Sequence, residues 1–174
     1  CRDNSGFTIC LLAHRSALVQ TAAMRYFLDC EFNGFGGELI SFALVPDDGG
    51  EEFYARVEMT AAPVDWVERH VMPFVDHVPV GLQCVPAPLA DVAAQLEAWL
   101  RGLDAVEIVA DWPEDIALFC RVLSFAPAEV IRIPPVTFRW LSLPGFSTAR
   151  NSAVPHNSLH DARALRDHVL GHLE

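Results

Sequence analysis

The 174-residue sequence contains no lysine, and its 12 basic residues are all arginine. They face 23 acidic residues, so that the formal net charge is −11 at pH 7. Proteins that bind nucleic acid through charge alone present a broad basic surface, which this composition excludes. Any nucleic-acid site must therefore be local or assisted by metal ions.

Closely spaced cysteine pairs and long apolar runs are both missing. The five cysteines are far apart, with no Cys-x-x-Cys pair, which favours free thiols in a reducing cytosol over a disulfide framework or a structural zinc site. The apolar run at residues 7–13 is far shorter than the ~18 residues that span a bilayer. We therefore expect a cytoplasmic protein without a membrane segment. The cysteines are Cys1, Cys10, Cys30, Cys84 and Cys120.

The composition is otherwise that of a globular domain, with 52% hydrophobic and 20% charged residues. The length is typical of one domain. The chain begins at Cys1, and Met24 stands directly before the first predicted strand. We therefore interpret residues 1–23 as an N-terminal extension or tag remnant, and residues 24–174 as the folded domain.

Hydrophobic periodicity predicts three strands, followed by alternating helices and strands. Predicted strands cover residues 25–31, 38–46, 52–59, 106–110 and 129–134. Predicted helices cover residues 63–71, 89–103, 113–123 and 158–173, with Pro63 in the first turn of the first helix. Three strands in an antiparallel meander plus parallel strands reached through crossover helices make an α/β fold with one mixed five-stranded sheet flanked by helices. This is the ribonuclease-H-like architecture.

Acidic residues gather in three segments. Asp29 and Glu31 lie on one face of a predicted strand, where they either share a metal ion or face solvent at the strand end. Where a strand meets a helix at residues 110–119, Asp111 can cap the helix, and Glu114 and Asp115 favour its positive end. The third segment contains His156 and Asp161.

A structural explanation also exists for the third segment, since Ser158 and Asp161 match a capping box. Together, however, the three segments follow an order that resembles the DEDDh class of 3′-to-5′ exonucleases, from about Met24 to the C-terminus. The opening of this domain is most similar to the small bacterial exoribonuclease branch. Asp111 is a departure, because it stands where the family usually has asparagine.

The resemblance implies that Asp29, Glu31, Asp115 and Asp161 hold two Mg²⁺ or Mn²⁺ ions and that His156 is the general base. Oxygen ligands suit these hard cations, and two such ions can activate water and stabilise the charge that develops in phosphodiester hydrolysis. Neutral imidazole can accept a proton near neutral pH. Two alternatives stay open: Glu114 assists or replaces Asp115, and His160 is the base.

Substrate contacts are predicted on both sides of these motifs. Residues 131–159 contain no acidic residue, and Arg139 and Arg150 in this stretch could guide a phosphate backbone to the metals; the other interpretation is an accidental loop composition. Phe32 and Asn33, after the first motif, are predicted to contact the terminal nucleotide, and Trp112 offers a stacking surface.

The predicted function is metal-dependent 3′-to-5′ exonuclease activity on single-stranded RNA or short oligoribonucleotides, with DNA as a further substrate, releasing nucleoside 5′-monophosphates. The preference for RNA and an expected homodimer rest on the resemblance alone. Two other hypotheses are a catalytically silent ribonuclease-H-like module that binds nucleic acid or a protein, and a hydrolase of small nucleotides.

Overall fold

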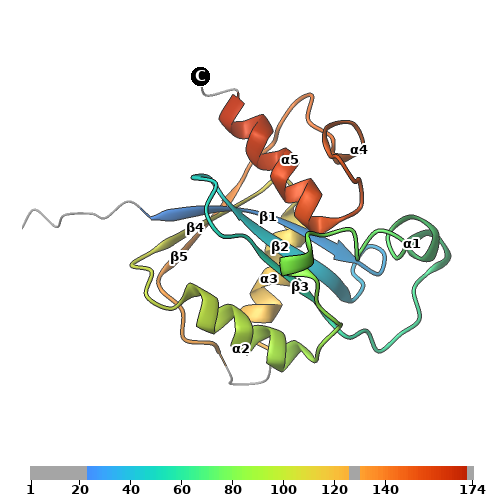
Figure 1. Cartoon of the computed structure of the whole chain (residues 1–174), viewed down its shortest axis with the longest axis horizontal. Helices are drawn as coiled ribbons and strands as arrows, with labels where there is room; N and C mark the ends of the chain where they lie inside the picture. Colours follow the sequence, from blue (N-terminus) through green and yellow to red (C-terminus); the bar gives the residue numbers. More distant parts are fainter. Residues whose placement is uncertain (1–22, 126–129, 172–174) are drawn as a thin grey trace, which may run out of the picture.

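A computed structural model describes residues 23–125 and 130–171 (Figure 1). The chain forms one five-stranded sheet with helices on both faces. The elements, in order, are β1 (Met24–Phe32), β2 (Leu39–Pro46), β3 (Phe53–Arg56), α1 (Asp65–His70), the 3₁₀ helix η1 (Val80–Leu82), α2 (Leu89–Leu100), β4 (Val106–Ala110), α3 (Pro113–Leu123), β5 (Val136–Trp140), α4 (Thr148–Asn151) and α5 (Ser158–Gly171).

The strand order is β3-β2-β1-β4-β5. Strands β1, β2 and β3 pair antiparallel, whereas β4 and β5 are parallel to β1. The predicted mixed sheet, with its antiparallel meander and parallel additions, is therefore confirmed. Strand β1 lies at the centre, which explains why its sequence is so apolar before Asp29.

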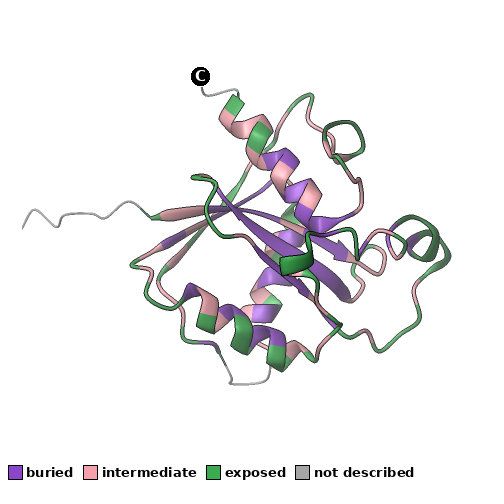
Figure 2. Ribbon diagram, viewed as in Figure 1, coloured by how far each residue is buried: buried purple, intermediate pink, exposed green. Residues whose placement is uncertain are grey.

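The two faces of β1 bury different residues, because side chains alternate along a strand. Tyr26, Leu28 and Cys30 pack toward α2 and α3 in the largest core cluster. Phe27 packs on the opposite face against Leu165 of α5. Figure 2 shows buried residues along the sheet and on the inner sides of these helices. The same alternation places Asp29 and Glu31 on the α5 face.

Helix α1 and strand β3 are shorter than predicted. The helix begins at Asp65, so Pro63 lies before it and not in its first turn. The reason is Asn33, whose side chain donates to the Ala62 carbonyl and accepts from the Val64 amide, holding this stretch extended. Strand β3 ends at Arg56, although the Val57 amide still donates to the Ile40 carbonyl of β2.

The predicted strand at residues 129–134 is wrong. Glu129 lies outside the described residues, and the amides of Ile131 and Arg132 donate to the Leu123 carbonyl and to the Glu97 carboxylate instead of to the sheet. The true strand, β5, starts after Pro134 and Pro135, which have no amide hydrogen to donate.

The remaining boundaries differ little from the prediction. Helix α2 ends at Leu100, three residues early, and α5 is described to Gly171. The short α4 and η1 were not predicted. Cys30, Cys84 and Cys120 are free thiols, as expected, whereas Cys1 and Cys10 fall outside the described residues, as does most of the predicted extension at residues 1–23. Among the residues that the structure describes, no helix is both long and apolar enough to cross a membrane.

Replacing Phe42 with alanine tests the main core. Its fully buried ring lies 5.5 Å from the ring of Phe53 and 5.7 Å from that of Phe119. We expect Phe42→Ala to lower the free energy of unfolding by ~3–5 kcal/mol. Phe35→Ala is the control, because that ring is 86% exposed, and it should change stability by less than ~0.5 kcal/mol. Equal effects in urea unfolding would contradict this core assignment.

Candidate active site

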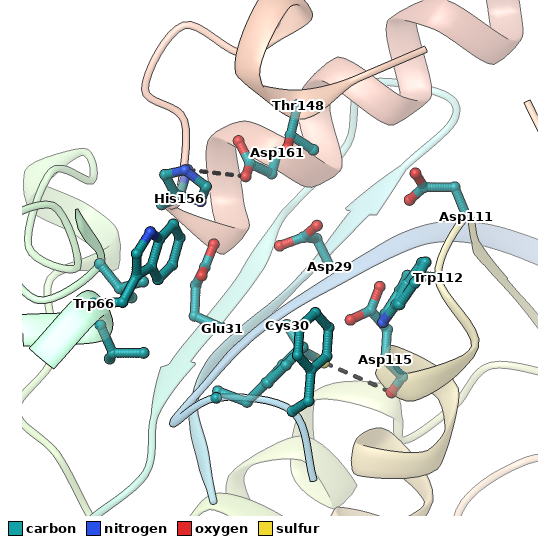
Figure 3. Close-up of a pocket in the computed structure, with 15 residues that line it drawn as sticks. Asp29, Cys30, Glu31, Trp66, Asp111, Trp112, Asp115, Thr148, His156 and Asp161 are labelled. Carbon is teal, nitrogen blue, oxygen red and sulfur yellow. Dashed lines mark hydrogen bonds between the residues drawn. The ribbon is translucent and has the colours of Figure 1, made fainter. Parts of the chain in front are cut away.

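The predicted acidic residues meet in a cleft of about 520 Å³. It lies at the carboxyl ends of β1 and β4, beside the first turns of α3 and α5 (Figure 3). The cleft is lined by Asp29, Glu31, Asp115, Asp161 and His156, which come from three separate parts of the chain. The sequence motifs therefore converge on one place.

Strand β1 supplies the first two carboxylates. Glu31 is buried, while Asp29 is partly exposed but has one carboxylate oxygen, Oδ2, buried without a hydrogen-bond partner among the described residues. Directly after Glu31 the pairing with β2 shifts by one residue, a β-bulge. Bulges re-aim side chains at the end of a strand, and here the irregularity falls where β1 leads into the cleft.

Helix α3 supplies Asp115 in its first turn. The N-cap residue is Trp112, and no side chain caps the helix, so the capping role expected of Asp111 is wrong. Pro113 is in the first turn, as predicted. Glu114 instead accepts a hydrogen bond of 2.6 Å from the Gly36 amide and does not line the cleft. The carboxylate of Asp115 is 2% exposed and lines the cleft, as Asp111 does.

Helix α5 supplies Asp161, and its cap is Asn157. The Asn157 Oδ1 atom accepts from the amides of Leu159 and His160, at 3.1 and 3.3 Å. The expected capping box of Ser158 and Asp161 is therefore wrong. Asp161 instead accepts a hydrogen bond of 3.0 Å from the His156 amide. This bond ties the loop of the histidine directly to the carboxylate.

His156 has a φ of 65°, a left-handed conformation that non-glycine residues rarely adopt. The neighbouring residue, Asn157, is anchored by its side chain, because its Nδ2 atom donates to the Phe74 carbonyl at 2.8 Å. The ring of Trp66 meets the imidazole edge-on, with ring centroids 5.0 Å apart. The position of the imidazole is thus set by an unusual backbone conformation and an aromatic neighbour.

Burial controls the ionisation of the cleft. Burial and the neighbouring carboxylates, first that of Asp115, raise the pKa of Asp29 well above its ordinary value. Burial likewise raises the pKa of Glu31 and that of Asp115 well above their ordinary values, and it raises the pKa of Asp161 to about 6. The carboxylates destabilise one another when all are charged.

The donor set fits hard divalent cations. Ligand atoms of Glu31, His156 and Asp161 lie within 4.8 Å of one another. Asp161 is 2% exposed, yet its Oδ1 atom has no hydrogen-bond partner among the described residues. Buried carboxylate oxygens without donors are suited to a cation, and a nearly all-oxygen set favours Mg²⁺ or Mn²⁺ over zinc.

The imidazole of His156 is suited to accept a proton. Burial, and secondly the charge of His70, lower the pKa of His156 below its ordinary value, which favours the neutral imidazole. His160 is directed elsewhere, with its Nε2 atom 2.9 Å from the His77 carbonyl. His160 does not line the cleft, which favours His156 over this alternative base.

The predicted substrate residues are distributed unevenly. Phe32 and Trp112 line the cleft, but both polar atoms of the Asn33 side chain are bonded to backbone at residues 62–64. Neither Arg139 nor Arg150 lines it: Arg139 lies 3.9 Å from Glu107, and Arg150 donates to the Gly145 carbonyl. Their roles stay predictions.

The sequence analysis missed several lining residues. Trp66 and Phe35 expose 49% and 86% of their surface at the cleft, and the Phe35 ring lies 6.4 Å from that of Trp112. Asp111 had been interpreted as a cap, and Thr148 lies in the unpredicted α4. Among these residues, only Phe35 gives a signal in the sequence, because it is an aromatic residue within a glycine-rich turn.

Comparison with solved structures supports the fold. The chain is similar to the nuclease domain of 3′hExo, a DEDDh family member whose crystal structure contains bound rAMP, with a TM-score of 0.57 and 14% sequence identity. The similarity covers 88% of this chain and 93% of that one. The sheet order and flanking helices thus match the ribonuclease-H-like fold of DEDDh exonucleases. No protein-family model matches the sequence, and no curated protein matches it either.

Asn157→Ala should show how strongly the cap stabilises this corner. The change removes two acceptor contacts at the helix start and the buried bond to Phe74, so we expect the free energy of unfolding to fall by ~2–3 kcal/mol. Ser124→Ala, which removes an exposed side-chain hydrogen bond, is the control and should have little effect. A loss below ~0.5 kcal/mol for Asn157→Ala in chemical denaturation would be inconsistent with the capping role.

The pH dependence of stability tests the strain at Asp161 in protein treated with EDTA. Its pKa is about 6 when folded, against an ordinary value of 3.8, so the folded protein binds this proton more tightly. The penalty of ionised Asp161 is therefore full above pH 6 and disappears as the pH falls toward 4. We expect Asp161→Asn, which keeps an acceptor for the His156 amide, to raise stability at pH 7.5 by on the order of 1–3 kcal/mol.

This gain should vanish near pH 4, whereas the exposed acid variant Asp104→Asn should show no comparable trend. A gain that grows on acidification, or no gain at pH 7.5, would refute the assignment.

Proposed function

We propose that the protein is a metal-dependent 3′-to-5′ exonuclease. The observation that carries this proposal is the convergence of four carboxylates and one neutral histidine, from three chain segments, in a single cleft of a ribonuclease-H-like fold. A carboxylate cluster with unpartnered buried oxygens destabilises the fold unless it binds cations. Function therefore explains an arrangement that stability alone does not favour.

Asp29, Glu31, Asp115 and Asp161 would hold two Mg²⁺ or Mn²⁺ ions. When bound, such ions activate water and stabilise negative charge on the attacking and leaving oxygens. The chain itself buries Glu31, Asp115 and Asp161 and fixes the carboxylates on β1, α3 and α5. Because these elements are rigid, little reorganisation is needed when substrate binds.

His156 would act as the general base. Its neutral imidazole accepts the proton of the attacking water, whose oxygen bonds to phosphorus while the bond to the 3′ oxygen of the preceding nucleotide breaks. The product is a nucleoside 5′-monophosphate. The hydrogen bond from the His156 amide to Asp161 keeps the base and a metal ligand in a fixed relation.

Single-stranded RNA ends or short oligoribonucleotides are the proposed substrates. Support comes from the similar nuclease domain, which was crystallised with rAMP, and from exposed aromatic rings at the cleft. Phe32, Phe35 and Trp112 form a chain of ring contacts of 6.3 and 6.4 Å along its edge. Such rings can stack on nucleobases without selecting a sequence.

A silent binding module and a hydrolase of small nucleotides are the rival functions. A silent module has no need for four clustered acids beside a histidine, because the repulsion among the acids lowers stability. An enzyme of small nucleotides would cleave mononucleotide esters and leave oligomers intact.

Digestion of a 5′-labelled single-stranded RNA and its DNA counterpart with Mn²⁺ tests the proposal. We expect a ladder that shortens from the 3′ end, is abolished by EDTA, and is slowed at least ~100-fold by Asp115→Asn or His156→Ala. Asp104→Asn is the matched control and should cleave like the wild type. Intact RNA under all conditions would contradict exonuclease activity and favour the binding module.

A further inference from the structure

The cleft contains a fifth carboxylate, Asp111, to which the proposed two-metal chemistry assigns no role. Strands β1 and β4 run parallel with Phe27 opposite Val109, and both side chains pack with Leu165 of α5. Two residues after Phe27 along β1, the alternation of side chains places Asp29 on this same face. The pairing of β1 with β4 ends at Phe27 and Val109, and Asp111 directly follows the end of β4. Asp29 and Asp111 both line the cleft.

Capping of α3 does not account for the position of the Asp111 side chain. The N-cap of α3 is Trp112, and no side chain caps that helix. The backbone is held separately, because the Asp111 carbonyl accepts a hydrogen bond of 3.1 Å from the Trp140 indole. The carboxylate itself lines the cleft beside Asp29 and Asp115 (Figure 3).

Asp111 adds to the repulsion in the cleft. Its charge contributes to the raised pKa values of Asp29, Asp115 and Asp161, and for Asp115 it is the strongest cause after burial. Burial also raises the pKa of Asp111, which a hydrogen bond from its own backbone amide and, secondly, the charge of His168 partly offset. Nearby like charges disfavour one another's ionised forms, so a fifth acid in the cleft makes the need for positive charge greater.

Two independent observations point to cations as the source of that charge. The Oδ1 atom of Asp161, on a side chain almost fully buried, and the Oδ2 atom of Asp29 both lack hydrogen-bond partners among residues 23–125 and 130–171. In addition, carboxylate oxygens of Glu31 and Asp161 lie within 4.8 Å of each other and of the imidazole of His156, the proposed base. Asp111 is not one of these three residues and lies with Asp29 and Asp115.

We infer that Asp111 is an additional ligand, directly or through a water molecule, of the divalent cation on the Asp29–Asp115 side of the cleft. The inference rests on the proposed function. A charged carboxylate binds a hard cation more strongly than a neutral amide does.

Calorimetric titration of metal-free protein with Mn²⁺ tests the inference without measuring activity. We expect the wild type to bind two ions, and Asp111→Asn to weaken one of them at least 10-fold while leaving the other unchanged. Glu31→Gln should weaken the other ion. Asp91→Asn, which removes an exposed acid of α2, is the matched control and should bind both ions like the wild type.

The outcomes separate this inference from the proposed function. Two ions bound with unchanged affinities by Asp111→Asn would overturn the inference and leave the two-metal proposal in place. A single wild-type ion that Asp111→Asn does not weaken, or equal weakening of both ions, would also overturn it. A wild type that binds no Mn²⁺ would overturn both. Circular dichroism confirms that each variant is folded.

Discussion

Asp29, Glu31, Asp115 and Asp161 bring four negative charges into one cleft from which much of the water is excluded. Burial raises the pKa of each carboxylate, and neighbouring negative charges add to the rise. Such a cluster lowers stability unless protons or cations neutralise it. The surrounding structure serves to hold these groups together against their repulsion.

Two features of the fold make this possible. Strand β1 is the central strand, paired on both sides, so its carboxylates cannot move apart without disrupting the sheet. Helices α3 and α5 present Asp115 and Asp161 in their first turns, where the helix dipole favours negative charge. A rigid scaffold with carboxylates fixed in advance is suited to divalent ions, whereas the net charge of −11 would otherwise repel a phosphate backbone.

Much of this could be predicted from local sequence patterns. The period of two along β1 placed Asp29 and Glu31 on one face, and the order of the acidic motifs indicated that they meet. The errors have physical causes. An apolar run at residues 129–134 has strand character, but hydrogen bonds to α2 and α3 capture it, and the sheet resumes only after Pro135.

Contacts between distant segments could not be predicted in this way. Asp111 fits a helix cap in sequence, and only the three-dimensional structure reveals that it lines the cleft. The left-handed backbone of His156 and its contact with Trp66 depend on the packing of α1 and α5. The arginines were predicted as substrate contacts because they lie in a stretch without acidic residues. Tertiary contacts decide their position, and Arg139 lies 3.9 Å from Glu107.

Crystallography of the protein with Mn²⁺, using the anomalous scattering of manganese, tests the central claim most directly. The account predicts anomalous density in the cleft, with at least one ion bound by the carboxylates of Asp29, Glu31 and Asp161. A structure at saturating Mn²⁺ with these carboxylates in place and no manganese among them would contradict it.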